Sequence, residues 1–435
     1  MRASAAIPAI GIRLIHALYC RLPSAHHVAA APAPSTPRAS MKISKIKVIV
    51  TCPGRNFTVV KIETDEGVYG VGEGTLNGSE LAVATALKHA SEILIGLDPH
   101  RIEDIWHLMY HHAYWRRGPI QMAAISAIDM ALWDIKGKVA KLPVYQLLGG
   151  KAREGCLVYG HASGATHEQL VESVRGFQHR GYKVIRVQHG GYGGPGAART
   201  LPPHRPGIPG FKIFEPVPYL LDTPRMFAHL RAEQGDEVEL CHDVHEQLTP
   251  QQAADLARNL QDFRLFFLED PVRPDHKDSF KLVREASTTP LAMGELFVSR
   301  WDCLPLFVNQ WIDYIRIKPQ HVGGITEAKK IFTLAEPYQV KSASHGARDI
   351  GPIGQAASIH VNLTIPNFGV QEWSEFGQQE KEVFGDGCFY HDGYAFPQEK
   401  PGLGIDINEA AAARFPYRKA YMPLVRREDG TMHVY

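Results

Sequence analysis

The sequence has few cysteines, no long apolar run and no excess of charge of either sign. Its six cysteines are scattered along the chain, without the short paired spacings of a zinc site or a disulfide framework. No apolar stretch approaches the roughly 20 residues needed to cross a bilayer. The 47 basic residues nearly balance the 46 acidic ones, which gives a formal charge of +1. These features argue against membrane insertion and nucleic-acid binding, and they favour a reducing cytoplasm.

The first 40 residues contain neither Asp nor Glu and end in an Ala- and Pro-rich run from 29 to 37. We therefore expect residues 1–40 to be a disordered or removable extension. Three interpretations stay open. The start could be over-extended, with Met41 as the true first residue. The segment could be an organelle transit peptide, or a poor export signal whose apolar stretch is interrupted by Arg13.

Residues 41–150 show the pattern of a small α+β domain. Residues 42–51 and 57–64 alternate as strands do, and Asp65-Glu66-Gly67 is a hairpin-turn signal. Helical patterns follow over 80–94 and 121–138, and the pair Gly149-Gly150 marks a boundary. We predict an α+β capping domain over 41–150.

Eight strand candidates follow, with helical segments between most of them. They cover residues 156–160, 184–188, 238–243, 265–269, 291–295, 313–318, 340–344 and 369–372. This alternation predicts an α/β fold, a (β/α) barrel over 151–435 whose C-terminal segment returns to the cap. The Gly- and Pro-rich stretch between Gln188 and a helix near Asp222 is predicted to be a structureless rim loop that acts as a lid or contacts substrate.

Three acidic residues, Asp243, Glu269 and Glu295, each close an apolar run and are evenly spaced. Any one of them alone could be a solvent-facing residue or a helix cap. In a parallel barrel, however, successive strands end on the same rim, so the three carboxylates would converge. Converging carboxylates repel one another unless a cation lies between them, and ligation by oxygen alone suits Mg²⁺ or Mn²⁺.

Further polar residues at the strand ends suit removal of a proton next to a carboxylate, with the metal stabilising the enediolate. They are Arg186, Gln188, His245, Arg316, Lys318, His345, Asp349 and Glu372. His245 lies two residues past Asp243, hence on the same strand face, where it could protonate a departing hydroxyl. It could instead be a structural histidine bonded to a carboxylate. Lys318 could be a second base, an anion ligand or a salt-bridged lysine.

At these residues, and from Met41 almost to the C-terminus, the chain resembles the mannonate dehydratase subgroup of the enolase superfamily. The motifs that carry the resemblance are Thr51-Cys-Pro-Gly-Arg-Asn-Phe57, Thr75-Leu-Asn-Gly78, Arg101-Ile-Glu-Asp-Ile-Trp106, Tyr114-Trp-Arg-Arg-Gly-Pro119, Asp129-Met-Ala-Leu-Trp-Asp-Ile-Lys136 and Tyr145-Gln-Leu-Leu-Gly-Gly150. The resemblance implies a cap-plus-barrel fold and syn loss of water from a sugar acid, which gives a 2-keto-3-deoxy acid.

The resemblance also implies roles for individual residues. Mg²⁺ would be held by Asp243, Glu269 and Glu295. Substrate would be contacted by Asn77, His161, Arg316, His345, Asp349 and Glu372. Arg186 and His245 would be catalytic, and Tyr192 is the candidate for the loop tyrosine that serves the family as base. Because the sixth strand ends in Arg316-Ile317-Lys318, without an Asp to orient a catalytic histidine, His345 is interpreted as a substrate hydrogen-bond donor and a racemase is disfavoured.

We therefore predict a Mg²⁺-dependent sugar-acid dehydratase that acts on D-mannonate or D-gluconate and forms a homo-oligomer. One alternative is a dehydratase on the same scaffold for a different acid sugar. The other is a metabolite-binding regulatory protein that has lost turnover.

Overall fold

The computed structural model describes residues 40–112, 114–192, 194, 199–346 and 349–433. The chain from Met41 onward forms one unit of tertiary contacts. The expectation for the N-terminal extension falls almost wholly outside the described residues. Its three interpretations therefore stay predictions.

The described chain begins with a three-stranded antiparallel sheet. The strands are β1 (Ile43–Thr51), β2 (Phe57–Thr64) and β3 (Tyr69–Glu73), in the order β1-β2-β3. The turn predicted between the second and third strands is confirmed: the Thr64 N–H donates to the Val68 carbonyl at 2.9 Å, and Gly67 has a φ of +80°. Glycine suits this position because a left-handed backbone costs it nothing.

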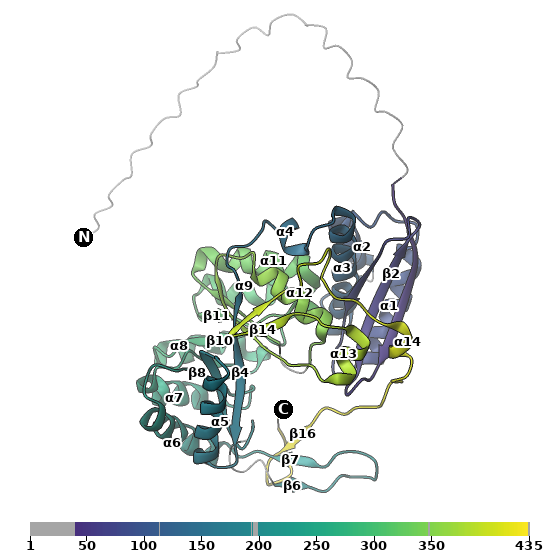
Figure 1. The fold of residues 1–435 in the computed structure, drawn as a ribbon. Helices are drawn as coiled ribbons and strands as arrows, with labels where there is room; N and C mark the ends of the chain where they lie inside the picture. Colours follow the sequence, from purple (N-terminus) through teal and green to yellow (C-terminus); the bar gives the residue numbers. More distant parts are fainter. Residues whose placement is uncertain (1–39, 113, 193, 195–198, 347–348, 434–435) are drawn as a thin grey trace, which may run out of the picture. The chain divides into compact units, whose positions relative to one another are not determined.

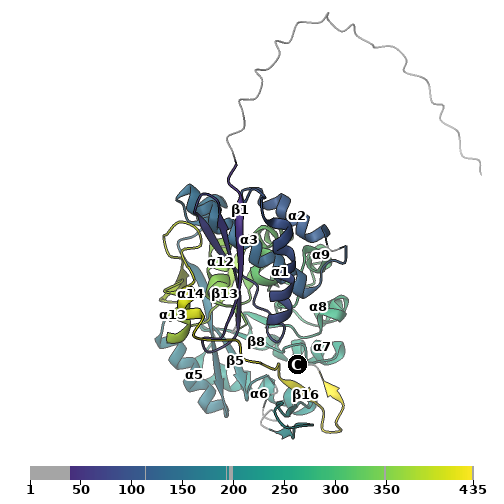
Figure 2. The same ribbon diagram turned by 90° about the vertical axis from the view of Figure 1, so that its right-hand side faces the viewer.

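Helices α1 (Glu80–Leu94) and α3 (Pro119–Ala140) pack on this sheet, and α2 (Ile102–His112) packs against α3 (Figure 1; Figure 2). Helix α1 has the predicted bounds, α3 is longer than predicted at both ends, and α2 was not predicted as a helix. Helix α3 lies against β3 so closely that a Cβ on Gly72 would come within 1.9 Å of the Ala127 carbonyl oxygen. Glycine is therefore required there.

A closed barrel of eight parallel strands follows, in the order β4-β5-β8-β9-β10-β11-β12-β13, with β13 pairing back to β4. The strands are β4 (Cys156–Gly164), β5 (Val184–His189), β8 (Glu239–Asp243), β9 (Phe267–Glu269), β10 (Leu291–Met293), β11 (Tyr314–Ile315), β12 (Lys341–Ser344) and β13 (Phe368–Glu372). The barrel and the N-terminal antiparallel sheet domain confirm the predicted fold class.

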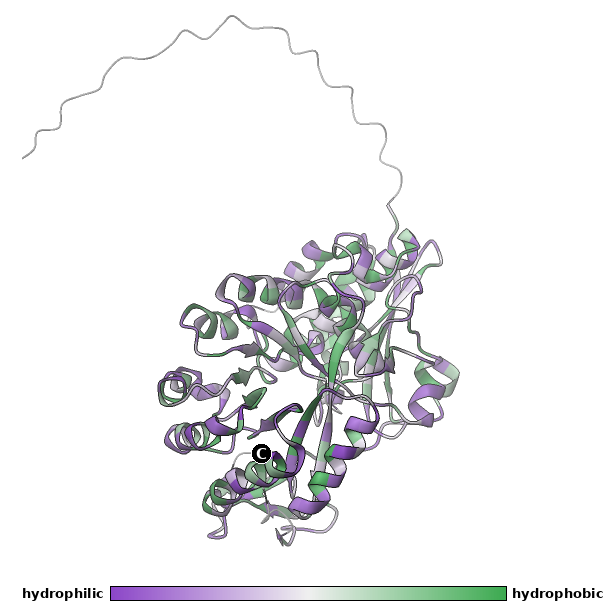
Figure 3. Cartoon of the chain, turned by 60° about the vertical axis from the view of Figure 1, so that its left-hand side comes forward, coloured by the Kyte–Doolittle hydropathy of each residue, from purple (hydrophilic) through white to green (hydrophobic). Residues whose placement is uncertain are grey.

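Helices surround the barrel strands and bury their apolar faces against them (Figure 3). They are α5 (His167–His179), α6 (Pro216–Gln234), α7 (Pro250–Leu260), α8 (Phe280–Ala286), α9 (Arg300–Val308), α10 (Pro319–Val322), α11 (Gly324–Ala335) and α12 (Pro352–Asn362), with α4 (Val144–Leu147) before β4. The predicted start of α7 is confirmed: Thr249 and Gln252 form a reciprocal capping box. The 3₁₀ turns Gln261–Phe263, Pro274–Ser279 and Glu336–Tyr338 lie in the connections of the described barrel.

Two predictions need correction. The rim stretch after Gln188 is not structureless, because β6 (Thr200–Leu201) and β7 (Phe211–Ile213) form a small sheet with β16 (Leu424–Arg426) and β17 (Met432–His433), at the lower end of Figure 1. Its partner strands come from the far end of the chain, which local sequence does not reveal. Several barrel strands are also shorter than predicted, so Glu295, Arg316 and Lys318 follow strand ends instead of lying within strands.

The C-terminal part of the chain contacts the cap. After α13 (Gln378–Phe384), the strands β14 (Phe389–His391) and β15 (Tyr394–Phe396) extend the sheet at β4, and α14 (Glu409–Ala412) follows. Lys47 and Lys61 of the cap sheet both form ion pairs with Glu409, at 3.0 and 2.8 Å. Within the described residues, no helix has both the length and the apolarity to cross a bilayer.

Glu73 joins the cap to the barrel. This fully buried carboxylate accepts hydrogen bonds from Thr75 Oγ1 (2.7 Å) and from the N–H groups of Gly351 (2.7 Å) and Gly354 (3.0 Å). The two glycine N–H groups belong to the start of α12, which otherwise leaves its first amides unpaired. Burial raises the pKa of Glu73 above its usual value.

Candidate active site

Five buried charged side chains form ion pairs with one another near the C-terminal ends of the barrel strands. We call Arg186, Asp243, Glu269, Arg316 and Glu372 the buried charge layer, because each is at most 6% exposed. Arg316 forms ion pairs with Glu269 and with Glu372 (Nη2 to Oε2, 2.7 Å). Arg186 Nη1 lies 2.9 Å from Asp243 Oδ2. Two arginines thus partly balance three carboxylates that burial would otherwise disfavour.

Three acidic groups, Glu269, Asp270 and Glu295, bring carboxylate oxygens together. One carboxylate oxygen from each lies within 4.8 Å of the others. Asp243 faces Arg186 instead, and its Oδ1 accepts from the His245 N–H at 2.8 Å. Of the predicted metal ligands, Glu269 and Glu295 thus lie close together, whereas Asp243 pairs with Arg186. Asp243 as a ligand stays a prediction, and Asp270 is an additional candidate.

The carboxylates fit a divalent cation. Glu269 Oε2 is buried and has no hydrogen-bond partner among the described residues. Burial first, and then neighbouring acidic groups, raise the pKa of Asp270; burial also raises that of Glu269, although the nearby Arg316 opposes it. A divalent cation between these carboxylates would offset the repulsion of their negative charges. Oxygen ligands of this kind suit Mg²⁺.

Tyr192 and His245, which we call the cavity wall, stand over the layer. Their ring centroids are 4.1 Å apart. Tyr192 OH accepts from Arg186 Nη2 at 3.1 Å, and His245 Nε2 lies 3.7 Å from Glu295 Oε1. His245 is near the carboxylates as predicted, but not through strand alternation. The strand ends at Asp243, and His245 has a φ of +57°, so a left-handed turn places its ring.

His345 and Lys318 lie on the other side of Glu295. His345 Nε2 is 2.7 Å from Glu295 Oε2, and its Nδ1 is 3.0 Å from Lys318 Nζ. Lys318 also forms an ion pair with Asp349, as the salt-bridge interpretation expects. Burial acts to raise the pKa of Glu295, but the contact with His345, together with the nearby His245 and Lys318, outweighs burial and leaves that pKa lowered.

His161 connects the layer to the cavity. Its Nε2 lies 2.7 Å from Glu372 Oε1, and its Nδ1 faces Arg186 at 3.4 Å. Burial and the charge of Arg186 lower the pKa of His161 to about 4. At neutral pH this histidine is uncharged, so its Nδ1 can accept from Arg186 while its Nε2 lies next to the Glu372 carboxylate.

A cavity of about 460 Å³ lies over these groups. Seven predicted site residues line it: Asn77, His161, Tyr192, His245, Glu295, His345 and Asp349. The other five, which form the buried charge layer, do not line it. The cavity therefore receives side chains from the cap, the barrel rim and the chain's C-terminal part.

Sequence reasoning missed several residues of this cavity: Leu76, Glu246, Leu296, His321 and Met422. Burial, with the charges of Glu295 and Asp243, raises the pKa of Glu246 to about 9. Glu246 and Asp270 each follow a predicted site residue, so strand alternation would have placed them on the opposite face. Their φ values of +63° and +39° redirect them, and without glycine no sequence signal marks such turns.

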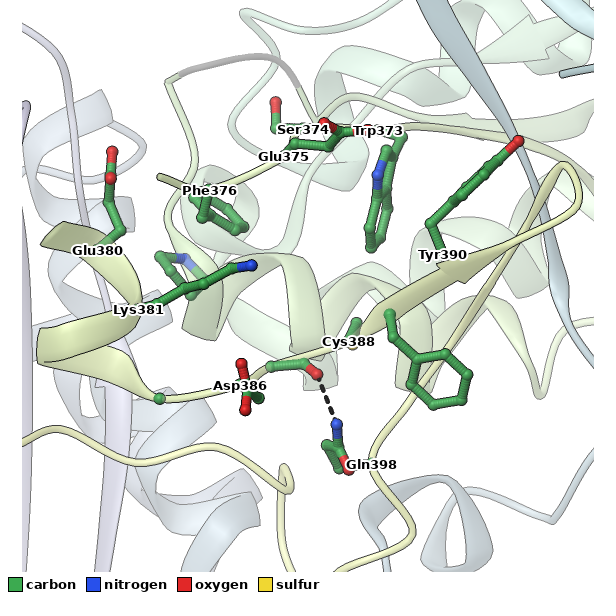
Figure 4. Close-up of a pocket in the computed structure, with 14 residues that line it drawn as sticks. Trp373, Ser374, Glu375, Phe376, Glu380, Lys381, Asp386, Cys388, Tyr390 and Gln398 are labelled. Atoms are coloured by element: carbon green, nitrogen blue, oxygen red, sulfur yellow. Dashed lines mark hydrogen bonds between the residues drawn. The ribbon is translucent and has the colours of Figure 1, made fainter. Parts of the chain in front are cut away.

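A second cavity of about 460 Å³ lies between α13 and β14 (Figure 4). Trp373, Phe376, Lys381 and Tyr390 line it, and Gln398 Nε2 donates to the Gly387 carbonyl at 2.9 Å beside it. None of the predicted site residues reaches it. It lacks the converging carboxylates of the first cavity and is not the candidate active site.

The cap, the barrel and the rim carboxylates together define a member of the enolase superfamily. Residues 34–149 match the N-terminal domain of mandelate racemase and muconate lactonizing enzyme, and residues 169–411 match the enolase C-terminal domain-like family. The chain belongs to this mandelate racemase/muconate lactonizing enzyme family.

Individual members of the family are similar to this chain over almost their whole length. The chain is 48% identical over 401 residues to a D-mannonate dehydratase of Sphingomonas sp., covering 90% of this chain and 99% of that protein. It is 47% identical to the D-galactonate dehydratase family member RspA of Cellvibrio japonicus, with the same coverage. A crystal structure of an enolase from Pantoea ananatis, with bound D-gluconate and Mg, matches with a TM-score of 0.86 and 44% identity, covering 91% of this chain and all of that one. The predicted mannonate dehydratase resemblance is confirmed.

Proposed function

We propose that this chain is a Mg²⁺-dependent hydro-lyase that converts D-mannonate or D-gluconate to a 2-keto-3-deoxy acid. The relatives named dehydratases and the neighbour with bound D-gluconate and Mg support the proposal. The observation that carries it is the cavity wall. A tyrosine next to an arginine and a histidine next to a carboxylate face one cavity above the acidic residues.

Asp243, Glu269 and Glu295 would hold the cation, with Asp270 close enough to take part. When bound, Mg²⁺ supplies the positive charge that stabilises negative charge developing on the substrate carboxylate. Arg316 keeps Glu269 and Glu372 in place below, through its two ion pairs. The ligands therefore need little rearrangement when the substrate arrives.

Tyr192 would remove the α-proton and His245 would protonate the leaving β-hydroxyl. Burial raises the pKa of Tyr192 strongly, and the Arg186 charge acts against that rise by favouring the phenolate. Asn77, His161, His345 and Asp349 face the cavity and would bind the substrate's hydroxyl and carboxylate groups. Arg316 and Glu372 lie below the cavity lining, so we assign them to positioning His161 and His345.

A second candidate is dehydration of a different acid sugar on the same scaffold. Relatives carry the names of both D-mannonate and D-galactonate dehydratase family members at nearly equal identity. Lys318 adds a positive charge to the cavity lining and could bind a second anionic group.

An assay of aldonic and aldaric acids for 2-keto-3-deoxy products tests both candidates. The panel should contain D-mannonate, D-gluconate and D-galactonate with saturating Mg²⁺. Turnover of D-mannonate or D-gluconate supports the first candidate, and turnover of another acid alone supports the second. If binding is detected but no acid is turned over, the non-catalytic metabolite-binding alternative replaces both.

We also propose that the chain forms a homo-oligomer. Tyr114 and Trp115, within one of the subgroup motifs, are 73% and 82% exposed, which is unusual for large aromatic side chains. Light scattering on the full chain measures the assembly. A monomeric mass would contradict the proposal.

A further inference from the structure

A group of two histidines and one aspartate lies on the outer side of the barrel, away from the cavity. His189 is the last residue of β5 and lies three positions after Arg186, so its side chain points to the opposite face of the strand. His167 is the first residue of α5, and Asp222 lies in α6. The outer layer of helices thus brings together three residues that are distant in sequence.

The side chains of His167, His189 and Asp222 are in direct contact. His189 Nδ1 lies 2.6 Å from Asp222 Oδ2, and His167 Nε2 lies 3.1 Å from Asp222 Oδ1. The two imidazole centroids are 4.5 Å apart, and one ligand atom of each residue lies within 4.8 Å of the others. Their side chains are 11 to 21% exposed, so the group is sheltered but open to small ions.

The hydrogen bonds of His189 leave room for a cation. His189 Nε2 lies 3.2 Å from the Ala165 carbonyl oxygen, which can only accept, so Nε2 carries the proton. In a neutral ring, Nδ1 then presents a lone pair to a carboxylate oxygen, and two acceptors at 2.6 Å repel. A cation bound by both atoms removes this repulsion, as a shared proton would. A backbone carbonyl that fixes the outer ring nitrogen is also the usual partner of a metal-binding histidine.

We propose that His167, His189 and Asp222 form a binding site for a divalent transition-metal ion such as Zn²⁺ or Co²⁺, separate from the carboxylate site. Two imidazole nitrogens and one carboxylate favour these ions over Mg²⁺, which prefers oxygen alone. These three ligands leave at least one coordination position of the metal open to water. The ring of His229, two turns after Asp222 on α6, lies 5.9 Å from that of His167 and adds a third imidazole to the neighbourhood.

Bound metal would stiffen the start of the segment that carries Tyr192. His189 is followed by Gly190, whose N–H donates to the Gly164 carbonyl at 2.9 Å, and Tyr192 follows two residues later. An ion that joins the end of β5 to α5 and α6 fixes the position from which this segment leaves the barrel.

The test is a Co²⁺ titration of the full chain in saturating Mg²⁺, followed by visible absorption. Mg²⁺ occupies the oxygen site, while Co²⁺ bound by nitrogen in a four- or five-coordinate site absorbs far more strongly than octahedral Co²⁺ bound by oxygen. We expect one equivalent to bind with strong absorption. His189→Gln and Asp222→Asn should each weaken this binding roughly 100-fold or more. His107→Gln/His111→Gln is the matched control, since those exposed histidines lie four residues apart on α2 and form a surface pair.

Three outcomes would overturn the proposal. They are wild-type absorption typical of oxygen ligation only, absorption unchanged in His189→Gln, and loss of binding in the α2 control. Each would leave the group as a hydrogen-bonded cluster that holds no metal ion. If His189→Gln does not fold, as judged by circular dichroism, His167→Gln serves instead, because it removes one ligand and keeps the His189–Asp222 contact.

Discussion

The buried charge layer and the cavity wall use ionisable groups in different ways. In the layer, Glu269, Arg316 and Glu372 are fully buried and held by ion pairs. In the wall, the rings of Tyr192 and His245 lie against each other at a tilt of 37° and line the cavity. Groups in the layer cannot exchange protons freely, so their work is to hold charge in place. Groups in the wall line the cavity, where they can reach a substrate, and we propose that their work is to move protons.

The largest expected effect comes from a change in the layer. Glu269→Gln removes one ligand charge, and we expect Mg²⁺-dependent turnover to fall at least about 1000-fold while the barrel stays folded. Turnover and melting temperature are measured together over a Mg²⁺ titration. Glu285→Gln, the same change at an exposed position on α8, is the control. Retained activity in Glu269→Gln, or full wild-type activity in chelator, would contradict the metal assignment.

Changes in the wall should separate the two proton transfers. We expect His245→Asn to stop dehydration but to keep exchange of the α-proton with solvent deuterium, because the base is intact. Tyr192→Phe should stop both, and each loss should be roughly 100- to 10,000-fold. Exchange is followed by proton NMR and dehydration by product formation, with Tyr338→Phe as control. Full turnover by Tyr192→Phe would move the base elsewhere, and Lys318 is the next residue to test.

Stability should respond to the layer more than to surface charge. Arg316→Met leaves Glu269 and Glu372 buried without their partner, so we expect the free energy of unfolding in chelator to fall by about 3–5 kcal/mol. Arg258→Met breaks only an exposed pair with Asp255 and should change it by less than about 0.5 kcal/mol. If Arg316→Met and Arg258→Met lowered the free energy of unfolding equally in urea denaturation, burial would not distinguish the two ion-pair sites.

Two buried histidines, His242 on β8 and His360 on α12, sharpen the contrast through pH. Burial lowers the pKa of His242 and of His360 to about 4, and both are at most 1% exposed. The unfolded chain binds these protons near pH 6.5 and the folded chain does not, so stability is lost as pH falls from about 6.5 to about 4. Each histidine should contribute roughly 1 kcal/mol per pH unit in that window. His360→Gln should show a smaller loss between pH 7 and pH 5, and an unchanged loss would argue against its neutral state.

The smallest effect is expected at the N-terminus. If residues 1–40 take no part in either region, a chain that starts at Met41 should match the full chain in melting temperature and turnover. Calorimetry and the dehydration assay measure both. A clear fall in melting temperature on truncation would show that the extension packs on the folded unit.

The sequence predicted the layer better than the wall. Glu269 and Glu372 close apolar strands, and this pattern places a side chain at a barrel rim whatever the loops do. Asp270 and Glu246 escaped prediction because left-handed turns at non-glycine residues reorient them. His245 was placed correctly for a reason that does not hold, since its strand ends two residues earlier.

Predictions also failed where distant segments meet. The rim stretch after β5 contains few apolar residues and many glycines and prolines, so the sequence predicted a loop there. Strand β7 forms because it pairs with β16, more than 200 residues later. Met422 reaches the cavity from that same C-terminal part. The local sequence pattern carries no information on such pairings, because the hydrogen bonds and packing that stabilise each strand come from the distant partner strand.

Glu73 has a consequence for how the protein unfolds. Its carboxylate is shared by Thr75 on the cap side and by the amides of Gly351 and Gly354 at the start of α12. If either domain melted alone, it would leave a buried acceptor or buried donors unpaired in the other, at a cost of about 1–3 kcal/mol for each group. The cap and the barrel are thereby coupled into one cooperative transition, and a ligand that binds in the barrel also protects the cap.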